Sequence, residues 1–450
     1  MIKQFLHYAI PSALAMFVSS LYTIIDGIFV GQGVGDSALA AVTVVLPLTI
    51  MLFGIATMFA VGGGTLVSKN FGSGNDDKSV DIFRQVFKLL IIVSTFISLI
   101  LIIFSNPIVK LLGATENLSA LASDYLRFYS IFCMPNLIGI TLNSFVRNDG
   151  NPKLAMISTI SGAITNIILD YIFIFPLGMG IKGAAIATGL GQLVTVSIVL
   201  PHFLCKKGKL SFGKSKFKID NIKEFILIGI PSFFSEATFS LIILCQNIAL
   251  VYFIGELGLS AFSVINYITT NIYMILVGLT FGAQPLLSYN YGAKNKNKIL
   301  RVYNIAATSS LIVTFIFSLI CLLFGRNLIS IFTSDLTISN MAYIGLNLTN
   351  LAFFAIGLNL ITTVFYQTVE APKYSSLICS FRCIIFLPIS LIILANLFGL
   401  NGIWLALLVS ELLSFISINI IINVKSYTNK ISSVKSVNIE DTIPKAQSNK

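Results

Sequence analysis

The amino-acid sequence predicts an all-α polytopic membrane protein with twelve transmembrane helices in two pseudo-symmetric six-helix bundles around a central cavity. Three observations lead to this fold class: an apolar composition, twelve apolar runs of spanning length, and an internal duplication. Of the 450 residues, 56% are hydrophobic and 10% are charged, whereas a water-soluble chain carries roughly 25% charged residues. The charged residues are therefore too few to cover the surface of water-soluble domains.

The predicted spans follow from length. A helix rises about 1.5 Å per residue, so crossing an apolar core of about 30 Å takes roughly 20 residues. Runs of this size occur at 5–30, 38–68, 84–105, 124–146, 153–175, 182–204, 223–254, 260–290, 300–324, 340–369, 374–398 and 401–424.

The basic residues test this count, because Lys and Arg gather on the cytoplasmic side of a membrane protein. Twelve spans place all Lys and Arg residues on one side, except Lys110, Arg127, Lys182 and Arg326. The partition predicts that both termini are cytoplasmic. It also explains the formal net charge of +11 as a signal of topology, so no nucleic-acid partner is expected.

The chain repeats itself at a shift of about 220 residues. Ile10-Pro11-Ser12 recurs as Ile230-Pro231-Ser232, and Asn151-Pro152-Lys153 corresponds to Ala371-Pro372-Lys373. Each half contains an even number of spans, so both halves enter the membrane in the same direction and are related by an axis along its normal. Two such bundles enclose a central cavity, although a duplication retained only for packing is the alternative.

The duplication divides the chain into four predicted parts. Residues 1–205 form the first six-helix bundle and 223–425 the second. Residues 206–222 form a basic cytoplasmic linker, which either sets the topology or contacts the anionic headgroups of membrane lipids. Residues 426–450 form a polar cytoplasmic tail.

Four carboxylates fall well inside predicted spans: Asp26, Asp170, Glu236 and Glu411. No Lys or Arg is expected at comparable depth. An ionised carboxylate near the bilayer centre costs several kcal/mol, so without a basic partner it must take a proton, bind a cation or face water. Each of these options belongs to transport chemistry.

Two of these acids are predicted to meet in one layer of the first bundle. Counted from the outer helix ends, Asp26, Asp170 and Thr188 lie roughly 6–9 Å below the outer surface at 1.5 Å per residue. Asn166 lies one turn deeper than Asp170 on the same face. These oxygens suit either a Na⁺ site or a site where two close carboxylates share a proton. The alternative to an ion site is that Asn166 and Thr188 only form ordinary hydrogen bonds between helices.

The second half does not repeat this set, because Gln246 and Leu407 replace Asp26 and Thr188. Glu236 lies near the midplane of its span, beyond Pro231, where it either attracts a cationic substrate or packs as a protonated, hydrogen-bonded side chain. Glu411 has no assigned role. The ion that drives transport is therefore expected to bind mainly in the first bundle.

Several motifs together resemble the multidrug and toxic compound extrusion (MATE) family, above all its MepA-like bacterial subgroup. They are Asp26-Gly-Ile-Phe-Val-Gly31, Ala38-Leu-Ala-Ala41, Asn70-Phe-Gly72, Arg147-Asn-Asp-Gly-Asn-Pro-Lys153 and Asn166-x-x-x-Asp170-Tyr171. The likeness covers almost the whole chain.

The resemblance implies a secondary active antiporter that works as a monomer in the bacterial cytoplasmic membrane. It exports small cationic amphipathic drugs in exchange for H⁺ or Na⁺. The resemblance places the ion site at Asp26, Asn166, Asp170 and Thr188, with the carbonyl of Ala184 as a further ligand. It implies no cofactor besides the coupling ion. Glu236 resembles an acid in span 7 of another family branch, which has an aspartate in span 10 where this chain has the neutral region around Asn359. With Gln246, these two residues are the predicted lining of the substrate cavity.

The sequence also bears on three rival functions. A flippase for a lipid-linked saccharide shares the architecture, but it should place Arg or Lys in the cavity, and the predicted spans hold none. An intramembrane enzyme is not expected, because the two histidines, His7 and His202, lie near cytoplasmic helix ends and no nucleophile–base or metal-ligand motif occurs. A nucleotide-driven pump would need a Gly-x-x-x-x-Gly-Lys-Ser/Thr loop, which is absent from the sequence.

Overall fold

A computed structural model describes residues 1–424 and 427–428, and all regular secondary structure within them is helical. The predicted tail at 426–450 therefore lies almost wholly outside the described residues. The helices of the first half are α1 Ile2–Gly33, α2 Asp36–Gly72, α3 Asp76–Ile103, α4 Ser105–Leu111, α5 Glu116–Ile131, α6 Cys133–Asn148, α7 Pro152–Ile174 and α8 Gly180–Leu204. Those of the second half are α9 Ile219–Phe253, α10 Glu256–Gly292, α11 Lys296–Ser330, α12 Leu336–Asn350, α13 Ala352–Thr368, α14 Pro372–Ser380, the π-helix η1 Phe381–Ile385, α15 Phe386–Phe398 and α16 Leu400–Ile421.

The helices confirm the predicted membrane fold. Ten helical segments among the described residues are long and apolar enough to span a membrane, and two bent pairs bring the number to twelve. The pairs are α5 with α6, bent by 52°, and α12 with α13, bent by 41°. The sequence predicted each pair as one uninterrupted span, at 124–146 and at 340–369. In the structure these two spans are broken at corresponding places of the two halves.

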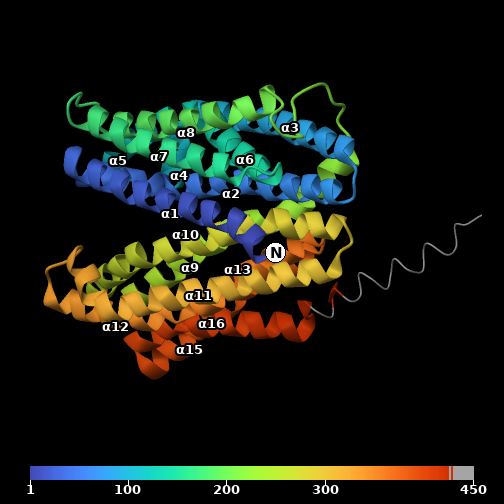
Figure 1. Ribbon diagram of the computed structural model, residues 1–450. Helices are drawn as coiled ribbons and strands as arrows, with labels where there is room; N and C mark the ends of the chain where they lie inside the picture. Colours follow the sequence, from blue (N-terminus) through green and yellow to red (C-terminus); the bar gives the residue numbers. More distant parts are fainter. Residues whose placement is uncertain (425–426, 429–450) are drawn as a thin grey trace, which may run out of the picture.

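Each half has its own buried core, and Figure 1 shows the two bundles one above the other. Helices α1 and α9 nevertheless begin in the opposite bundle. Phe5 and Ala9 of α1 pack into the core of the second half, and Phe225 and Ile228 of α9 pack into that of the first. The halves therefore meet in a reciprocal way, with α1 against α10 and α2 against α9.

Glycines allow the halves to approach closely at one end of the molecule. A Cβ added at Gly72 would collide with the backbone carbonyl of Tyr289, and one at Gly292 with that of Lys69. The Lys69 ammonium also forms ion pairs with Glu370 and, at 3.3 Å, with Glu224. We call the end defined by Lys69, Gly72 and Gly292 the closed end.

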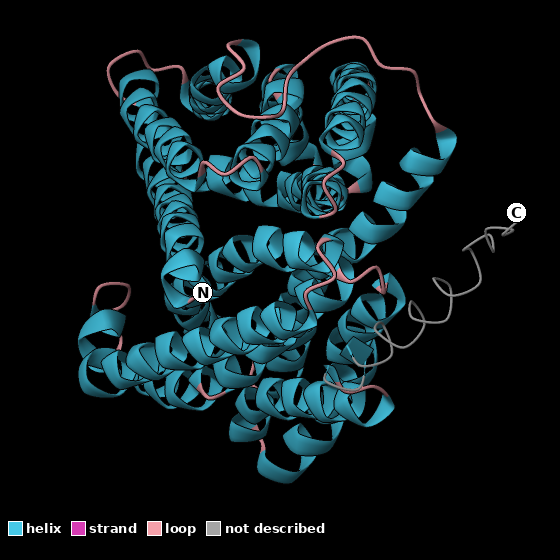
Figure 2. Cartoon of the chain, turned by 45° about the vertical axis from the view of Figure 1, so that its right-hand side comes forward, coloured by secondary structure: helices cyan, strands magenta, loops and turns pink. Residues whose placement is uncertain are grey.

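The segment that joins the halves lies on the first bundle, as Figure 2 shows for the long loop between them. The Arg84 Nε donates to the Ser211 carbonyl at 2.9 Å, and the Lys88 Nζ to that of Ser215 at 2.7 Å. The second half thus begins from a fixed point on the surface of the first.

Candidate functional site

Asp26 and Asp170 lie together in the first half, on helices α1 and α7, which pack against each other. Asp170 is fully buried and Asp26 is half-buried. Their carboxyl groups are close enough to interact with each other, and a hydrogen bond between them would require a proton on one of them. With both groups ionised, Asp26 Oδ1 and both carboxyl oxygens of Asp170 have no hydrogen-bond donor among the described residues.

Asn166 and Thr188 complete this group of oxygens. Asn166 is buried one turn before Asp170 on α7, and its side chain interacts with the Asp170 carboxyl. The Asn166 Nδ2 donates to Thr188 Oγ1 at 3.4 Å, which leaves Asn166 Oδ1 without a partner. The structure therefore brings together four of the five residues predicted for the ion site. Ala184 is buried one turn before Thr188 on α8, and the role of its carbonyl as a ligand stays a prediction.

The sequence reasoning missed the tyrosines around the two aspartates. Tyr22 and Tyr125 both lie near enough to interact electrostatically with Asp26 and Asp170. Tyr129 lies one turn beyond Tyr125, and its hydroxyl accepts a hydrogen bond from the Asn136 side chain at 2.7 Å. Two tyrosines at a spacing of four residues in an apolar span were the available signal.

The chemistry of the site suits a proton or an alkali cation. Its free oxygens come from two carboxyls and one amide, which are hard ligands. Among the described residues, no group of three or more His, Cys, Asp or Glu side chains is placed to hold a metal ion.

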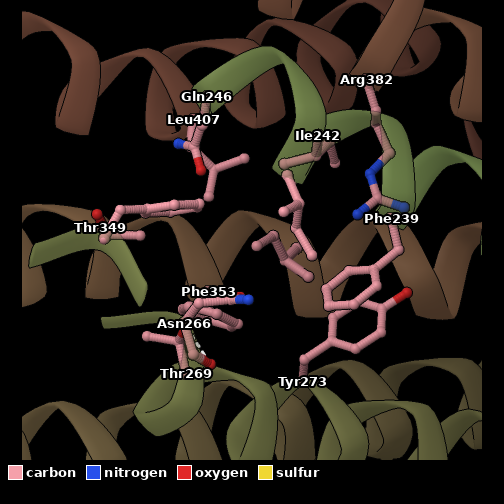
Figure 3. A pocket seen from close by; sticks show the side chains of 13 residues that line it. Phe239, Ile242, Gln246, Asn266, Thr269, Tyr273, Thr349, Phe353, Arg382 and Leu407 are labelled. Atoms are coloured by element: carbon pink, nitrogen blue, oxygen red, sulfur yellow. Dashed lines mark hydrogen bonds between the residues drawn. The ribbon is translucent and has the colours of Figure 1, made fainter. Parts of the chain in front are cut away.

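The predicted substrate-cavity residues of the second half separate in the structure. Gln246 is buried and lines a cavity between α9, α10, α12, α13, η1 and α16 (Figure 3). Glu236 is half-buried on α9, near Tyr273, and forms no hydrogen bond or ion pair with a described residue. Asn359 does not line this cavity, because its Nδ2 donates to the Glu411 carboxylate at 2.6 Å and to the Glu411 carbonyl at 2.9 Å.

One expectation about charge is wrong. The sequence placed Arg382 with the cytoplasmic basic residues and left Glu411 without a basic partner. In the structure Arg382 is 2% exposed, and its Nε donates to Glu411 Oε1 at 2.9 Å and to Oε2 at 2.8 Å. The π-helix η1 directs Arg382 into the bundle, where its charge balances that of Glu411. The expectation that the spans hold no Arg or Lys fails for the same reason.

The comparisons with known proteins agree with the duplicated helical fold. A family model described as MatE matches residues 11–172 and 231–392, once in each half. The chain is 26% identical to the multidrug export protein MepA of Staphylococcus aureus over 425 residues, which covers 93% of both chains. It is 25% identical to MepA of Staphylococcus saprophyticus over 414 residues, covering 91% of this chain and 90% of the relative.

Solved structures show the same fold. One is described as the outward-facing conformation of a multidrug resistance MATE family transporter of the MOP superfamily. It superposes with a TM-score of 0.90 at 22% identity and covers 97% of each chain. A second, described as a MATE in the bent conformation, has a TM-score of 0.85 at 22% identity and covers 97% of this chain and 96% of its own.

Proposed function

The chain belongs to the MatE family, and on this premise we propose that it is a secondary active multidrug efflux antiporter. It exports cationic lipophilic compounds in exchange for H⁺ or Na⁺ and carries out no covalent chemistry. Two relatives of similar length, both named as multidrug export proteins, support this class of function. The proposal includes a monomer in the bacterial cytoplasmic membrane, with both termini in the cytoplasm.

The Asp26–Asp170 pair carries the proposal. Two carboxyls in contact inside a membrane bundle cannot both stay ionised without a positive charge between them. Neither aspartate forms an ion pair with a described residue, and Lys182, the basic residue nearest to Asp170 in the sequence, pairs with Asp124 at 3.1 Å. A mobile cation, either a shared proton or Na⁺ held also by Asn166 and Thr188, is what neutralises the pair.

Coupling follows if the ion and the drug favour different arrangements of the two bundles. The bundles are locked together at the closed end, which faces the cytoplasm in the predicted topology. An ion that enters from the opposite side binds the aspartates on α1 and α7, and α1 also packs against α10 of the second half. Ion binding is thereby linked to the contact between the halves. Drug and ion must each lower the affinity for the other, typically by about 1–3 kcal/mol.

No second function is proposed. Arg382 is buried in the second bundle. A lack of basic residues in the spans is therefore no argument against a flippase for a lipid-linked saccharide. The relatives named as multidrug exporters favour drug export instead.

The test uses purified protein in lipid vesicles, with ethidium movement measured under an imposed Na⁺ gradient and, separately, an imposed pH gradient. We expect Asp26→Asn to reduce ion-driven transport at least about tenfold, because the substituted pair no longer needs a cation. The gradient that drives the wild-type protein identifies the ion. Asp124→Asn, the same change at a half-exposed residue paired with Lys182, is the control and should transport normally. Unchanged transport by Asp26→Asn would refute the proposal.

A further inference from the structure

The cavity in the second half lies beside the Arg382–Glu411 ion pair. It is lined by residues of α9, α10, α12, α13, α16 and η1, and Arg382 is the only charged side chain among the described residues that line it. Arg382 follows Pro372, the first residue of its span, by ten positions. At about 1.5 Å per residue this is close to half of a bilayer core of about 30 Å. A charged residue at such depth is rare and usually functional.

Arg382 is held by one of its three nitrogens and keeps the other two free. Its Nε donates to both carboxylate oxygens of Glu411, while Asn359 supplies a further donor to Oε2. Neither Nη1 nor Nη2 has a hydrogen-bond partner among the described residues. The Glu411 carboxylate is therefore well satisfied, whereas the four N–H groups on Nη1 and Nη2 have no acceptor among the described residues.

A second buried donor faces the same cavity. Gln246 is 1% exposed and lines the cavity, and its Nε2 has no hydrogen-bond partner within the part of the chain that the structure describes. No carboxylate lines the cavity to accept these bonds. A buried donor left without an acceptor costs about 1–3 kcal/mol, so these groups favour a ligand that brings acceptor atoms.

Aromatic rings form the remaining surface next to Arg382. Phe239 and Tyr273 are stacked, with ring centroids 4.2 Å apart and an angle of 15° between their planes. Figure 3 shows the Arg382 side chain extending toward this pair, with Gln246 on another side of the cavity. Arg382 thus offers a fork of N–H groups beside flat apolar surfaces, which is the arrangement that binds a carboxylate attached to a planar ring.

From these contacts we propose that the cavity of the second half binds the carboxylate of aromatic substrates, with Arg382 as its main partner and Gln246 as a further donor. The inference rests on the proposed function and refines its substrate class. The preferred compounds are zwitterions, in which a cationic ring system also carries a carboxylate. The π-helix that positions Arg382 agrees with this role, since π-helical turns occur frequently at functional sites.

The size of the cavity determines which part of the substrate enters it. Its volume is about 40 Å³, which admits a carboxylate group, whereas drug-sized ligands occupy roughly 300–1,000 Å³. The carboxylate of the substrate therefore enters this space, and the rings of the substrate push aside the stacked Phe239 and Tyr273 side chains at its edge. The Glu236 carboxyl, one turn before Phe239, lies outside the lining and is free to meet the cationic part.

Two dyes that differ only at the acid group test the proposal. Rhodamine 110 has a free carboxylate, and rhodamine 123 is its methyl ester. The measurement is the ratio of their Kd values (rhodamine 110 over rhodamine 123), determined by fluorescence anisotropy with the purified full-length protein. In Arg382→Gln/Glu411→Gln, which removes both buried charges together, we expect this ratio to rise about tenfold, equivalent to about 1.4 kcal/mol.

Two single variants sharpen the test. Glu411→Gln leaves the Arg382 charge uncompensated and should lower the ratio. Gln246→Leu removes one donor without touching the ion pair and should raise the ratio about threefold, and it remains informative if the double variant does not fold. Arg147→Gln changes another buried arginine, which lies over the Phe281 ring away from the cavity, and should leave the ratio unchanged.

The outcomes separate this inference from the proposed function. Equal weakening of both dyes in the double variant and in Gln246→Leu would overturn the carboxylate site, because it would indicate a structural role alone. A wild-type protein with the expected selectivity that moves neither dye under any ion gradient would support the site and contradict the antiporter.

Discussion

At the scale of single residues, the two halves treat buried charge in opposite ways. In the first half Asp26 and Asp170 lie together with no basic partner among the described residues, and in the proposed function a mobile cation neutralises them. In the second half Arg382 and Glu411 balance each other's charge without an external ion, and Asn359 donates a further hydrogen bond to Glu411. The pair of aspartates suits the exchange of an ion, and the Arg382–Glu411 pair suits a binding site whose charges stay in place.

The buried ion pair makes a prediction about stability. Arg382→Gln should destabilise the protein strongly, by about 3–5 kcal/mol, because it leaves the Glu411 carboxylate buried without its partner. The double change Arg382→Gln/Glu411→Gln should recover most of this loss. Thermal unfolding of the purified variants in detergent measures both. Arg326→Gln, at an exposed residue 3.4 Å from Asn340, is the control, and an Arg382→Gln protein as stable as this control would contradict the pairing.

The sequence predicted the first of these sites but not the second, for a physical reason. Asp26, Asn166 and Asp170 were located by depth and helical spacing, which follow from regular helices. Arg382 was assigned to the nearest membrane surface, because hydropathy alone does not show where a long side chain points. Its actual direction depends on a π-helical turn and on a partner on α16, two features that span counting does not contain.

At the scale of elements, the broken spans show the same limit. Helices α5 and α6 separate at Phe132, whose ring occupies the space that a side chain at Gly189 on α8 would take. Helices α12 and α13 separate at Leu351, with no proline or glycine at the break. These bends depend on packing between helices distant in sequence. By contrast, the first residues of α7 and α14 follow from a local signal, since both helices begin with a proline.

The closed end depends on the fit between α2 and α10, which gives a prediction for Gly292. Gly292→Ala places a methyl group against the Lys69 carbonyl, so the two helices must part there. A cysteine placed at the buried Ser288, in a background without other cysteines, should then react about tenfold faster with a membrane-impermeant maleimide. Gly31→Ala, whose added Cβ would meet only a Leu39 methyl at 3.6 Å, is the control. Labelling no faster than in this control would argue against a closure made by glycine contacts.

At the scale of the whole molecule, the duplication explains the architecture. The two halves differ in their buried charged residues, and the proposed functions of the halves differ accordingly. Twelve spans in two bundles were predictable because length, apolarity and repeated motifs are properties of the chain itself. The reciprocal contact, in which α1 and α9 each begin in the opposite core, was not predictable from a single sequence. In the proposed function, this contact links an ion bound beside α1 to the way the halves meet.

The most direct test of the central claim is the Kd of ethidium for the purified protein, measured over a series of Na⁺ concentrations and a series of pH values. If Asp26 and Asp170 hold the coupling ion, one of these two cations raises the Kd of the wild-type protein, and neither affects the variant Asp26→Asn/Asp170→Asn. The same dependence on that cation in the variant would place ion coupling elsewhere and contradict the account.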